Sequence, residues 1–285
     1  MKYRYGKVIR LIARIMALIL VFSLTLVSCE EEPKRNFPDN GNDVAVGNSP
    51  NKQPSGNSNS GNKNNNSNNN SNNNNSNSGK KRVAITYDDG PHNVYTVKIV
   101  DELAKYGFNA TFFVVGNRVD GTDYNGAKGI TYAASKGNEI AIHAYTHSKY
   151  YNKCSDEDYE EELSKTYDAI KAKVPNAKVK LMRPVGGAIT KERIESCDYS
   201  VILWDVDSLD WNLKHDGEEG VKQIVNNVMS TVKNGSIILM HDLYENTYLA
   251  TQQILKQLDE QGYDVVSVSE LLGSPKAGVK YSRAQ

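Results

Sequence analysis

Two adjacent carboxylates, Asp88 and Asp89, follow a short apolar run and precede a Gly-Pro pair. The run, residues 83–87, is rich in β-branched side chains and bounded by breakers, so it predicts a buried strand with both carboxylates at its C-terminal end. Neighbouring carboxylates repel each other unless a cation or hydrogen-bond donors offset the repulsion. A surface Asp-Asp-Gly turn is the alternative interpretation of this motif taken alone.

A pair of histidines, His143 and His147, is separated by three residues. This spacing is common among metal ligands, and it would place both imidazoles on one face if the segment is helical. On its own the spacing does not identify a metal site. Two histidines and one aspartate are, however, a usual ligand set for catalytic zinc, which keeps an open position for water.

Alternating strands and helices must position these side chains. From Lys80 the composition is globular, and Ser155-x-x-Asp158 is a capping motif that begins a long helix. Repeated βα units predict a parallel sheet, closed or nearly closed as a barrel, with functional residues at the C-terminal ends of its strands. We expect strands over 82–87, 110–115, 139–143, 179–182, 200–205, 235–240 and 264–268, and helices over 94–106, 124–136, 155–174, 191–196, 217–233 and 247–261.

Five ordered motifs resemble those of the polysaccharide deacetylases, the NodB-homology enzymes of carbohydrate esterase family four. The resemblance covers residues 80–272 and implies a deformed (β/α) barrel that hydrolyses the N-acetyl group of a glycan with the help of a metal ion. The motifs are Thr86–Pro91, His143-x-x-x-His147, Arg183–Gly187, Asp207–Trp211 and Leu239–His241.

The resemblance assigns a metal site and a general base. Asp89, His143 and His147 would bind one divalent metal ion, for which zinc is favoured and cobalt, nickel or manganese are alternatives. Asp88 would accept a proton from the attacking water, because a carboxylate beside an activated water needs only to take up that proton. Arg183 would keep Asp88 ionised and oriented, although a purely structural ion pair is the alternative.

The resemblance also assigns a general acid, His241, whose ring would be oriented by Asp210. A backbone N–H after Arg183 would stabilise the oxyanion. The residues expected around the acetyl group are Gly186 or Gly187 for the oxyanion, and Trp211 and Leu239 as pocket walls, with ordinary core positions as the alternative for the last two.

Two positions depart from the family pattern. Ala144 stands where the family has Ser or Thr, whose hydroxyl helps to fix the loop between the histidines, and Val185 replaces a proline near the expected oxyanion site. Neither change removes a group that takes part in the chemistry. Of the remaining polar and aromatic residues, we expect Asp207 in a turn or cap, His92 and His215 in loops or at the surface, and Tyr145 as one possible wall of a sugar groove.

The N-terminal region predicts export and anchoring. Residues 1–28 combine a basic start with an apolar stretch too short for a membrane span, which is typical of a signal peptide. Leu26–Cys29 resembles a lipobox, so we expect a lipid on Cys29; an uncleaved anchor helix is the alternative. Residues 29–79, dominated by Asn and Ser, predict a disordered tether. We expect an extracytoplasmic protein held at the cell membrane and facing the wall.

The remaining cysteines and the chain end allow fewer conclusions. Cys154 and Cys197 could form a disulfide in an oxidising compartment or remain buried thiols, and the sequence leaves both open. The last ten residues, 276–285, are expected as a C-terminal tail after a catalytic domain over 80–275. The formal net charge is zero, and the sequence has no Lys/Arg run of the kind expected for nucleic-acid binding. We expect a monomer.

The favoured function is hydrolysis of the N-acetyl group of N-acetylglucosamine in cell-wall peptidoglycan. N-acetylmuramic acid, chitin-like oligomers, an exopolysaccharide and O-acetylated xylan are alternative substrates. A non-catalytic glycan-binding lipoprotein with the same fold is the alternative from another class. A third interpretation is a metal-dependent hydrolase of another bond, against which the Arg183 and the Asp210–His241 pairs argue.

Overall fold

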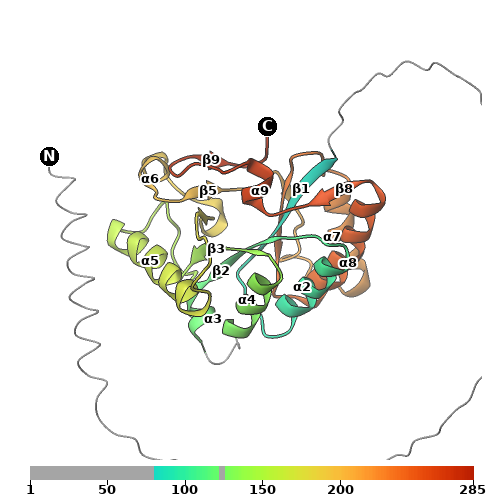
Figure 1. Cartoon of the computed structure of the whole chain (residues 1–285), viewed down its shortest axis with the longest axis horizontal. Helices are drawn as coiled ribbons and strands as arrows, with labels where there is room; N and C mark the ends of the chain where they lie inside the picture. Colours follow the sequence, from blue (N-terminus) through green and yellow to red (C-terminus); the bar gives the residue numbers. More distant parts are fainter. Residues whose placement is uncertain (1–79, 122–125) are drawn as a thin grey trace, which may run out of the picture. The chain divides into compact units, whose positions relative to one another are not determined.

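The computed structural model describes residues 80–121 and 126–285. The predicted signal peptide, Cys29 and the Asn/Ser-rich tether lie outside the described residues. Within them, nine strands form one curled sheet with helices packed around its outer face (Figure 1). No helix in this described part is both long enough and apolar enough to cross a membrane.

The central strand is β1 (Lys81–Asp88), and it is buried along most of its length. It pairs in parallel with β2 (Thr111–Val115) on one side and β7 (Ile237–His241) on the other, while its first residues pair with β8 (Tyr263–Val265). Burial on both faces explains its near-continuous apolar sequence. The order β6-β7-β1-β2-β3-β4-β5-β9 includes β3 (Glu139–Ala144), β4 (Leu181–Met182), β5 (Ser200–Ile202), β6 (Val206–Asp207) and β9 (Lys280–Tyr281).

Every paired strand in the sheet runs parallel to its neighbour, as the βα pattern predicts. In Figure 1, α2, α8 and α7 lie side by side along one flank, whereas α5 covers the other flank. The helices are α2 (Tyr95–Lys105), α3 (Gly116–Asp120), α4 (Gly126–Ser135), α5 (Asp156–Lys173), α6 (Lys191–Ser196), α7 (Gly217–Met229), α8 (Glu245–Glu260) and α9 (Val268–Leu272), with a 3₁₀ turn η1 (Val185–Gly187).

The predicted capping motif of α5 is confirmed. The Ser155 hydroxyl accepts a hydrogen bond from the Asp158 N–H at 3.1 Å, which satisfies one of the free amides of the first turn. Three acidic residues in that turn favour the positive end of the helix dipole. The buried face of α5, which includes Tyr159, Glu162 and Thr166, packs toward β3.

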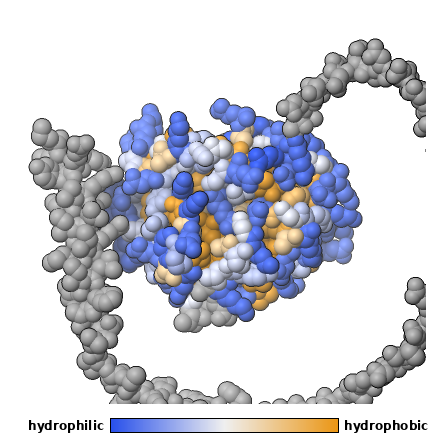
Figure 2. All heavy atoms as spheres, viewed as in Figure 1, coloured by the Kyte–Doolittle hydropathy of each residue, from blue (hydrophilic) through white to orange (hydrophobic). Residues whose placement is uncertain are grey.

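Apolar side chains fill both sides of β1, and their alternation assigns the direction of its polar residues. Val83, Ile85 and Tyr87 belong to the large core between sheet and helices, whereas Ala84 belongs to a second cluster inside the curl of the sheet. Successive strand residues point to opposite faces, so Thr86 and Asp88 share the inner face with Ala84. Figure 2 shows a largely hydrophilic rim with apolar patches nearer the middle of the visible face of this domain.

Three expectations from the sequence differ from the structure. His143 lies on β3 and His147 in the bend after it, so the helical alternative for this pair is wrong. The expected strand over 264–268 ends at Val265, because Ser267 caps the short helix α9. Residues 276–285 do not form a separate tail, since β9 pairs with β5 and Arg283 bridges to Ser236 beside β7.

Both described cysteines are free thiols. Cys154 Sγ lies 3.3 Å from Arg193 Nη1, and Cys197 is buried. Burial raises the pKa of the Cys197 thiol, as expected where an apolar environment disfavours the thiolate.

Candidate active site

The candidate site begins where β1 and β7 end on the inner face of the sheet. Asp88 and His241 are register partners in the parallel pairing of these strands. Four positions before these residues, Ala84 of β1 and Ile237 of β7 belong to the apolar cluster inside the curl of the sheet, so the final polar side chain of each strand faces the same space. Asp88 is almost completely buried, and the His241 side chain is 12% exposed.

Arg183 forms a buried ion pair with Asp88. Its side chain is fully buried, and its Nη1 donates at 2.7 Å both to Asp88 Oδ1 and to the Thr86 hydroxyl. Its Nε and Nη2 donate to the carbonyls of Ile202 and Leu203 at 3.1 and 3.2 Å. Burial lowers the pKa of Arg183, but the guanidinium remains charged because of its high ordinary pKa and the Asp88 carboxylate. The expected ion pair is therefore present with all three guanidinium nitrogens bonded.

Two aromatic rings enclose this guanidinium. Arg183 Cζ lies 4.2 Å from the Phe113 ring centroid and 5.5 Å from that of Trp204. Trp204 also packs against Gly187, where an added Cβ would come 3.2 Å from the indole. The sequence did not single out either ring, because both lie within predicted strands and no local pattern distinguishes them from core residues.

Asp89, His143 and His147 converge, with one potential ligand atom of each within 4.8 Å of the other two. Asp89 Oδ1 lies 3.2 Å from His143 Nε2 and 3.0 Å from His147 Nε2. That oxygen is buried, yet no contact with it satisfies hydrogen-bond geometry among the described residues. Lone pairs that face one space without bonding to one another suit a shared cation, and the donor set of two imidazoles and one carboxylate suits zinc and similar transition metals.

The orientation of the His143 ring follows from the hydrogen bond of its Nδ1 atom. His143 Nδ1 lies 2.8 Å from the Arg183 carbonyl oxygen, which can only accept, so Nδ1 carries the proton and Nε2 presents its lone pair toward Asp89. Tyr151 donates to the His143 carbonyl at 3.1 Å. Burial lowers the pKa of His143, but the negative charges of Asp88 and Asp89 outweigh it and raise that pKa.

The acidic character of Asp89 fits the same arrangement. Burial raises its pKa, yet the adjacent rings of His143 and His147 outweigh burial and hold that pKa far below its ordinary range. Asp89 is thus an anion in the folded protein, as a metal ligand must be. Its backbone is in the left-handed region (φ 70°), as is that of His147 (φ 61°), so both ligands sit on turns that are unusual for residues with a Cβ.

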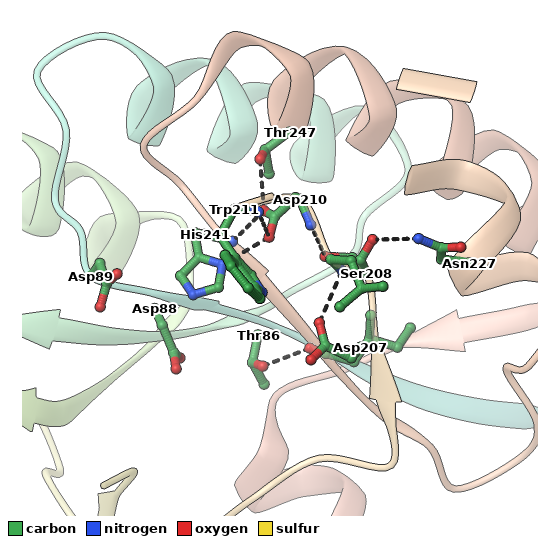
Figure 3. Close-up of polar contacts among 12 residues, drawn as sticks. Thr86, Asp88, Asp89, Asp207, Ser208, Asp210, Trp211, Asn227, His241 and Thr247 are labelled. Atoms are coloured by element: carbon green, nitrogen blue, oxygen red, sulfur yellow. Dashed lines mark hydrogen bonds and ion pairs between the residues drawn. The ribbon is translucent and has the colours of Figure 1, made fainter. Parts of the chain in front are cut away.

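A second carboxylate–imidazole pair lies opposite. Asp210 Oδ1 and His241 Nδ1 are 2.8 Å apart, and Asp210 also accepts from the backbone N–H of His241, the N–H of Trp211 and the Thr247 hydroxyl at 2.7, 2.9 and 2.7 Å (Figure 3). Figure 3 shows the His241 ring between Asp210 and the pair Asp88 and Asp89. Burial lowers the pKa of His241, but Asp210, Asp88 and Asp89 outweigh it and raise that pKa to about 9. The imidazole is therefore protonated at neutral pH and can donate a proton.

Hydrogen bonding in the η1 turn distinguishes between the two candidate oxyanion donors, the backbone N–H groups of Gly186 and Gly187. Gly186 and Gly187 both have positive φ, 59° and 71°, which favours glycine at these positions. The Gly187 N–H donates to the Pro184 carbonyl at 2.9 Å and is thus already bonded. The Gly186 N–H is not part of that bond, which makes it the better candidate. Tyr150, 54% exposed, packs directly over Gly186 and was not distinguished by the sequence.

The remaining predicted residues take separate positions. Leu239 is buried and on the inner face of β7, whereas Trp211 is 47% exposed beside Asp210. Asp207 is the last residue of β6, and its Oδ1 accepts from the Leu209 N–H at 2.9 Å, where the chain leaves the strand. An open cavity of about 390 Å³ adjoins Asp89 and His147, and its other lining residues are Val115, Asn117, Arg118, Gly121 and Thr146.

His92 lies in a loop, as expected, but it also caps a helix. Its Nδ1 accepts from the N–H groups of Val94 and Tyr95 at 3.1 and 3.2 Å, at the start of α2. Burial, followed by the charge of Arg118, lowers the pKa of His92. His215 is exposed in the turn before α7, as expected from the sequence.

Two buried carboxylates near the site escaped the sequence analysis. Asp242 accepts from the Thr96 hydroxyl and packs against Gly90, while its Oδ1 has no hydrogen-bond partner among the described residues. Burial raises the pKa of Asp242 to about 7. Glu162 of α5 accepts three hydrogen bonds from residues 145–146, between the two histidines. Neither residue lies in a motif, and only the fold brings them to the site.

Comparison with known proteins places these residues in a wider context. Residues 75–201 match the family model described as polysaccharide deacetylase. The peptidoglycan-N-acetylmuramic acid deacetylase PdaC of Bacillus subtilis is 35% identical over 192 residues, which cover 67% of this chain and 39% of PdaC. The peptidoglycan-N-acetylglucosamine deacetylase of Bacillus cereus is 36% identical over 203 residues, which cover 68% of this chain and 89% of that relative.

A solved structure of the T48 deacetylase with substrate shares the fold. It superimposes with a TM-score of 0.64 at 35% identity, and the match covers 71% of this chain and 96% of that one. The chain thus spans less than half the length of PdaC but nearly the whole of the T48 deacetylase chain.

Proposed function

We propose that this chain, which belongs to the polysaccharide deacetylase family, hydrolyses the N-acetyl group of a glycan with one divalent metal ion held by Asp89, His143 and His147. The observation that carries the proposal is that a proton acceptor and a proton donor, each paired with a buried residue of opposite charge, lie beside these three ligands. Asp88 is supported by Arg183, and His241 by Asp210.

The reaction requires one proton acceptor and one proton donor. When bound, a divalent ion supplies Lewis acidity, which lowers the pKa of a water molecule and polarises a carbonyl group. Asp88 takes the proton as the water oxygen adds to the acetyl carbon. His241 gives its proton to the departing nitrogen as the C–N bond breaks, and the products are acetate and a free amine.

The chain's own groups make both transfers possible at neutral pH. The guanidinium of Arg183 pairs directly with Asp88 at 2.7 Å and holds its carboxylate in place. Asp210 keeps the His241 ring oriented and its pKa high. The backbone N–H of Gly186 is positioned to stabilise the oxyanion, and Leu239 and Trp211 would line the acetyl pocket.

We favour peptidoglycan N-acetylglucosamine as the substrate, in line with the Bacillus cereus relative, and N-acetylmuramic acid is the specific alternative because PdaC acts on it. The test is to treat fully N-acetylated peptidoglycan with the protein, release muropeptides and locate the lost acetyl group by mass spectrometry. Loss from N-acetylglucosamine supports the proposal, whereas loss from N-acetylmuramic acid alone would replace it. No loss from either would direct the search to chitin-like oligomers, exopolysaccharide or acetylated xylan.

We favour zinc as the metal, since two imidazoles and one carboxylate suit it; cobalt, nickel and manganese are alternatives. The predicted signal peptide and the lipobox-like residues 26–29 support a lipid-anchored protein that faces the cell wall. We also propose that it acts as a monomer. Incorporation of labelled fatty acid tests the anchor, and a Cys29→Ser variant should lose both the label and membrane association.

The non-catalytic alternative is disfavoured by the site itself. A glycan-binding protein has no need for a buried arginine beneath a carboxylate, or for a buried aspartate that holds an imidazole protonated. Both pairs are complete here, together with all three candidate ligands.

A further inference from the structure

Glu162 is a buried carboxylate in the second turn of α5, and only 4% of it is exposed. A carboxylate in such a position is costly unless donors satisfy its oxygens. One of its oxygens, Oε2, accepts from the backbone N–H groups of Tyr145 and Thr146 at 2.7 and 2.8 Å. The other, Oε1, accepts from the Thr146 hydroxyl at 2.6 Å. All three donors come from the short bend between His143 and His147.

That bend needs an anchor. β3 ends at Ala144, and the chain then turns within three residues so that the His147 ring returns to within 3.0 Å of Asp89 Oδ1. The turn places His147 in the left-handed backbone region, which costs a residue with a Cβ on the order of 1 kcal/mol or more. Two adjacent N–H groups that point at one carboxylate oxygen fix the direction of the chain immediately before that strained residue.

The other side of the bend is held as well. The Tyr145 carbonyl accepts from the Asn117 N–H at 3.0 Å, at the start of α3. The Tyr145 ring packs against Gly116, where an added Cβ would come 2.5 Å from the ring, so this contact is possible only because position 116 is a glycine. Tyr145 is therefore packed against α3 and is only partly exposed.

The carboxylate also replaces an anchor that the sequence lacks. The residue after His143 is Ala144, where a hydroxyl was expected to fix this loop, and it is fully buried without a polar group. Glu162 supplies the missing restraint from a neighbouring helix.

We propose that Glu162 is a positioning residue for the metal site: its carboxylate fixes the bend of residues 145–146 so that His147 can act as a ligand together with Asp89 and His143. The inference rests on the proposed metal-dependent function. Because outer partners of metal ligands typically contribute about 10–100-fold in metal affinity, removal of the Glu162 carboxylate should weaken metal binding by about that factor.

The experiment compares the affinity for zinc, measured by competition with a chelating dye, in the full-length wild-type and variant proteins. Glu162→Ala should raise the zinc Kd by about 10–100-fold. With cobalt, its visible absorption spectrum should change toward that of His147→Ala, which a merely structural role would not produce. Two controls on the same helix separate local from general effects. Glu161→Ala changes an exposed residue paired with Lys165, and Leu163→Ala removes a buried apolar side chain and should lower the melting temperature. Both should keep the wild-type cobalt spectrum.

Two conservative variants decide the matter even if Glu162→Ala does not fold. Glu162→Gln keeps one oxygen within reach of both N–H groups and should stay within a few-fold of wild-type zinc affinity. Glu162→Asp keeps the charge but lacks the reach, and should bind zinc as weakly as expected for Glu162→Ala. Wild-type affinity and spectrum in both Glu162→Ala and Glu162→Asp would overturn the inference. A wild-type protein that binds neither ion would overturn the proposed function and this inference together.

Discussion

Asp88 and His241 are register partners at the ends of adjacent parallel strands, and each is held from behind by a buried residue of opposite charge. The pairing places the proposed proton acceptor and proton donor on the same inner face of the sheet, next to the ligand triad. Each group has its own support, Arg183 for Asp88 and Asp210 for His241, so the two side chains are held in place independently of each other.

Replacement of Asp88 separates proton transfer from metal binding. Asp88→Asn keeps a side-chain oxygen that can accept from Arg183, so the fold and the metal site should remain intact. The amide cannot take up a proton, and turnover should fall by about 10²–10⁴-fold. Acetate release and zinc content measured on one preparation check both parts. Asp207→Asn, a change at the end of β6, should keep wild-type turnover. A similar rate in Asp88→Asn would remove Asp88 from the role of base.

Replacement of Asp210 should change the pH dependence of the reaction. Asp210 holds the pKa of His241 at about 9, so loss of its charge in Asp210→Asn should lower that pKa. The general acid then loses its proton at lower pH, and the alkaline limb of the rate profile should move to lower pH. Thr247→Val removes one hydrogen bond to Asp210 but keeps the charge, and its alkaline limb should stay in place. An unmoved limb in Asp210→Asn would contradict the assignment of His241.

The same pKa predicts a contribution to stability. Because the folded-state pKa of His241 lies above its ordinary value of 6.5, the imidazolium stabilises the fold fully below pH 6.5, and this contribution is lost as pH rises through about 9. The free energy of unfolding of the metal-free protein, measured by denaturant titration between pH 6 and 10, should therefore decrease over that window. Asp210→Asn should flatten this decrease, and an equal slope in both proteins would show that another group is responsible.

Removal of the His147 ligand should weaken metal binding more than it destabilises the fold. His147 is 41% exposed at its side chain, so His147→Ala should change the melting temperature of the metal-free protein little. Zinc affinity should fall by more than the about 10–100-fold expected for an outer partner, because a direct ligand is lost. His92→Ala, which removes a helix-capping imidazole outside the triad, should keep the wild-type affinity. Full zinc occupancy in His147→Ala at limiting metal would exclude it as a ligand.

The close contact between Gly90 and Asp242 should be intolerant of a side chain. A Cβ at position 90 would lie 2.2 Å from Asp242 Oδ1, so Gly90→Ala should destabilise the fold by about 1–3 kcal/mol. Asp242→Ala in the same chain should recover part of that loss, because it removes the atoms that clash. Thermal unfolding of the two single variants and the double variant forms a cycle, and strict additivity in it would show that the two positions do not interact.

The motif residues could be predicted because they end strands of one parallel sheet, whose C-terminal ends meet wherever the sheet closes. Glu162 could not, because Glu160, Glu161 and Glu162 are identical in type and only the docking of α5 against β3 selects the one that faces the bend. Asp242 was likewise hidden, since its partners Thr96 and Gly90 come from the other end of the domain sequence.

Short helices and strands could not be predicted from the sequence for a different reason. β9 contains two residues and α3 five, which is too few to show a periodic pattern of apolar side chains. The position of His147 after β3 depends on left-handed backbone geometry, which a histidine in the sequence does not predict. The choice between Gly186 and Gly187 required the hydrogen bond of the Gly187 N–H to Pro184, which sequence spacing does not reveal.

The central claim is that acetyl hydrolysis depends on a metal ion held by Asp89, His143 and His147. The most direct test is to measure acetate release from N-acetylated peptidoglycan by the purified protein, before and after removal of metal with a chelator, and again after addition of zinc. We predict that release stops on metal removal and returns with zinc in the wild-type protein, but does not return in His147→Ala. Release that continues in the metal-free protein, or its absence in the zinc-loaded wild type on every N-acetylated glycan offered, would contradict the account.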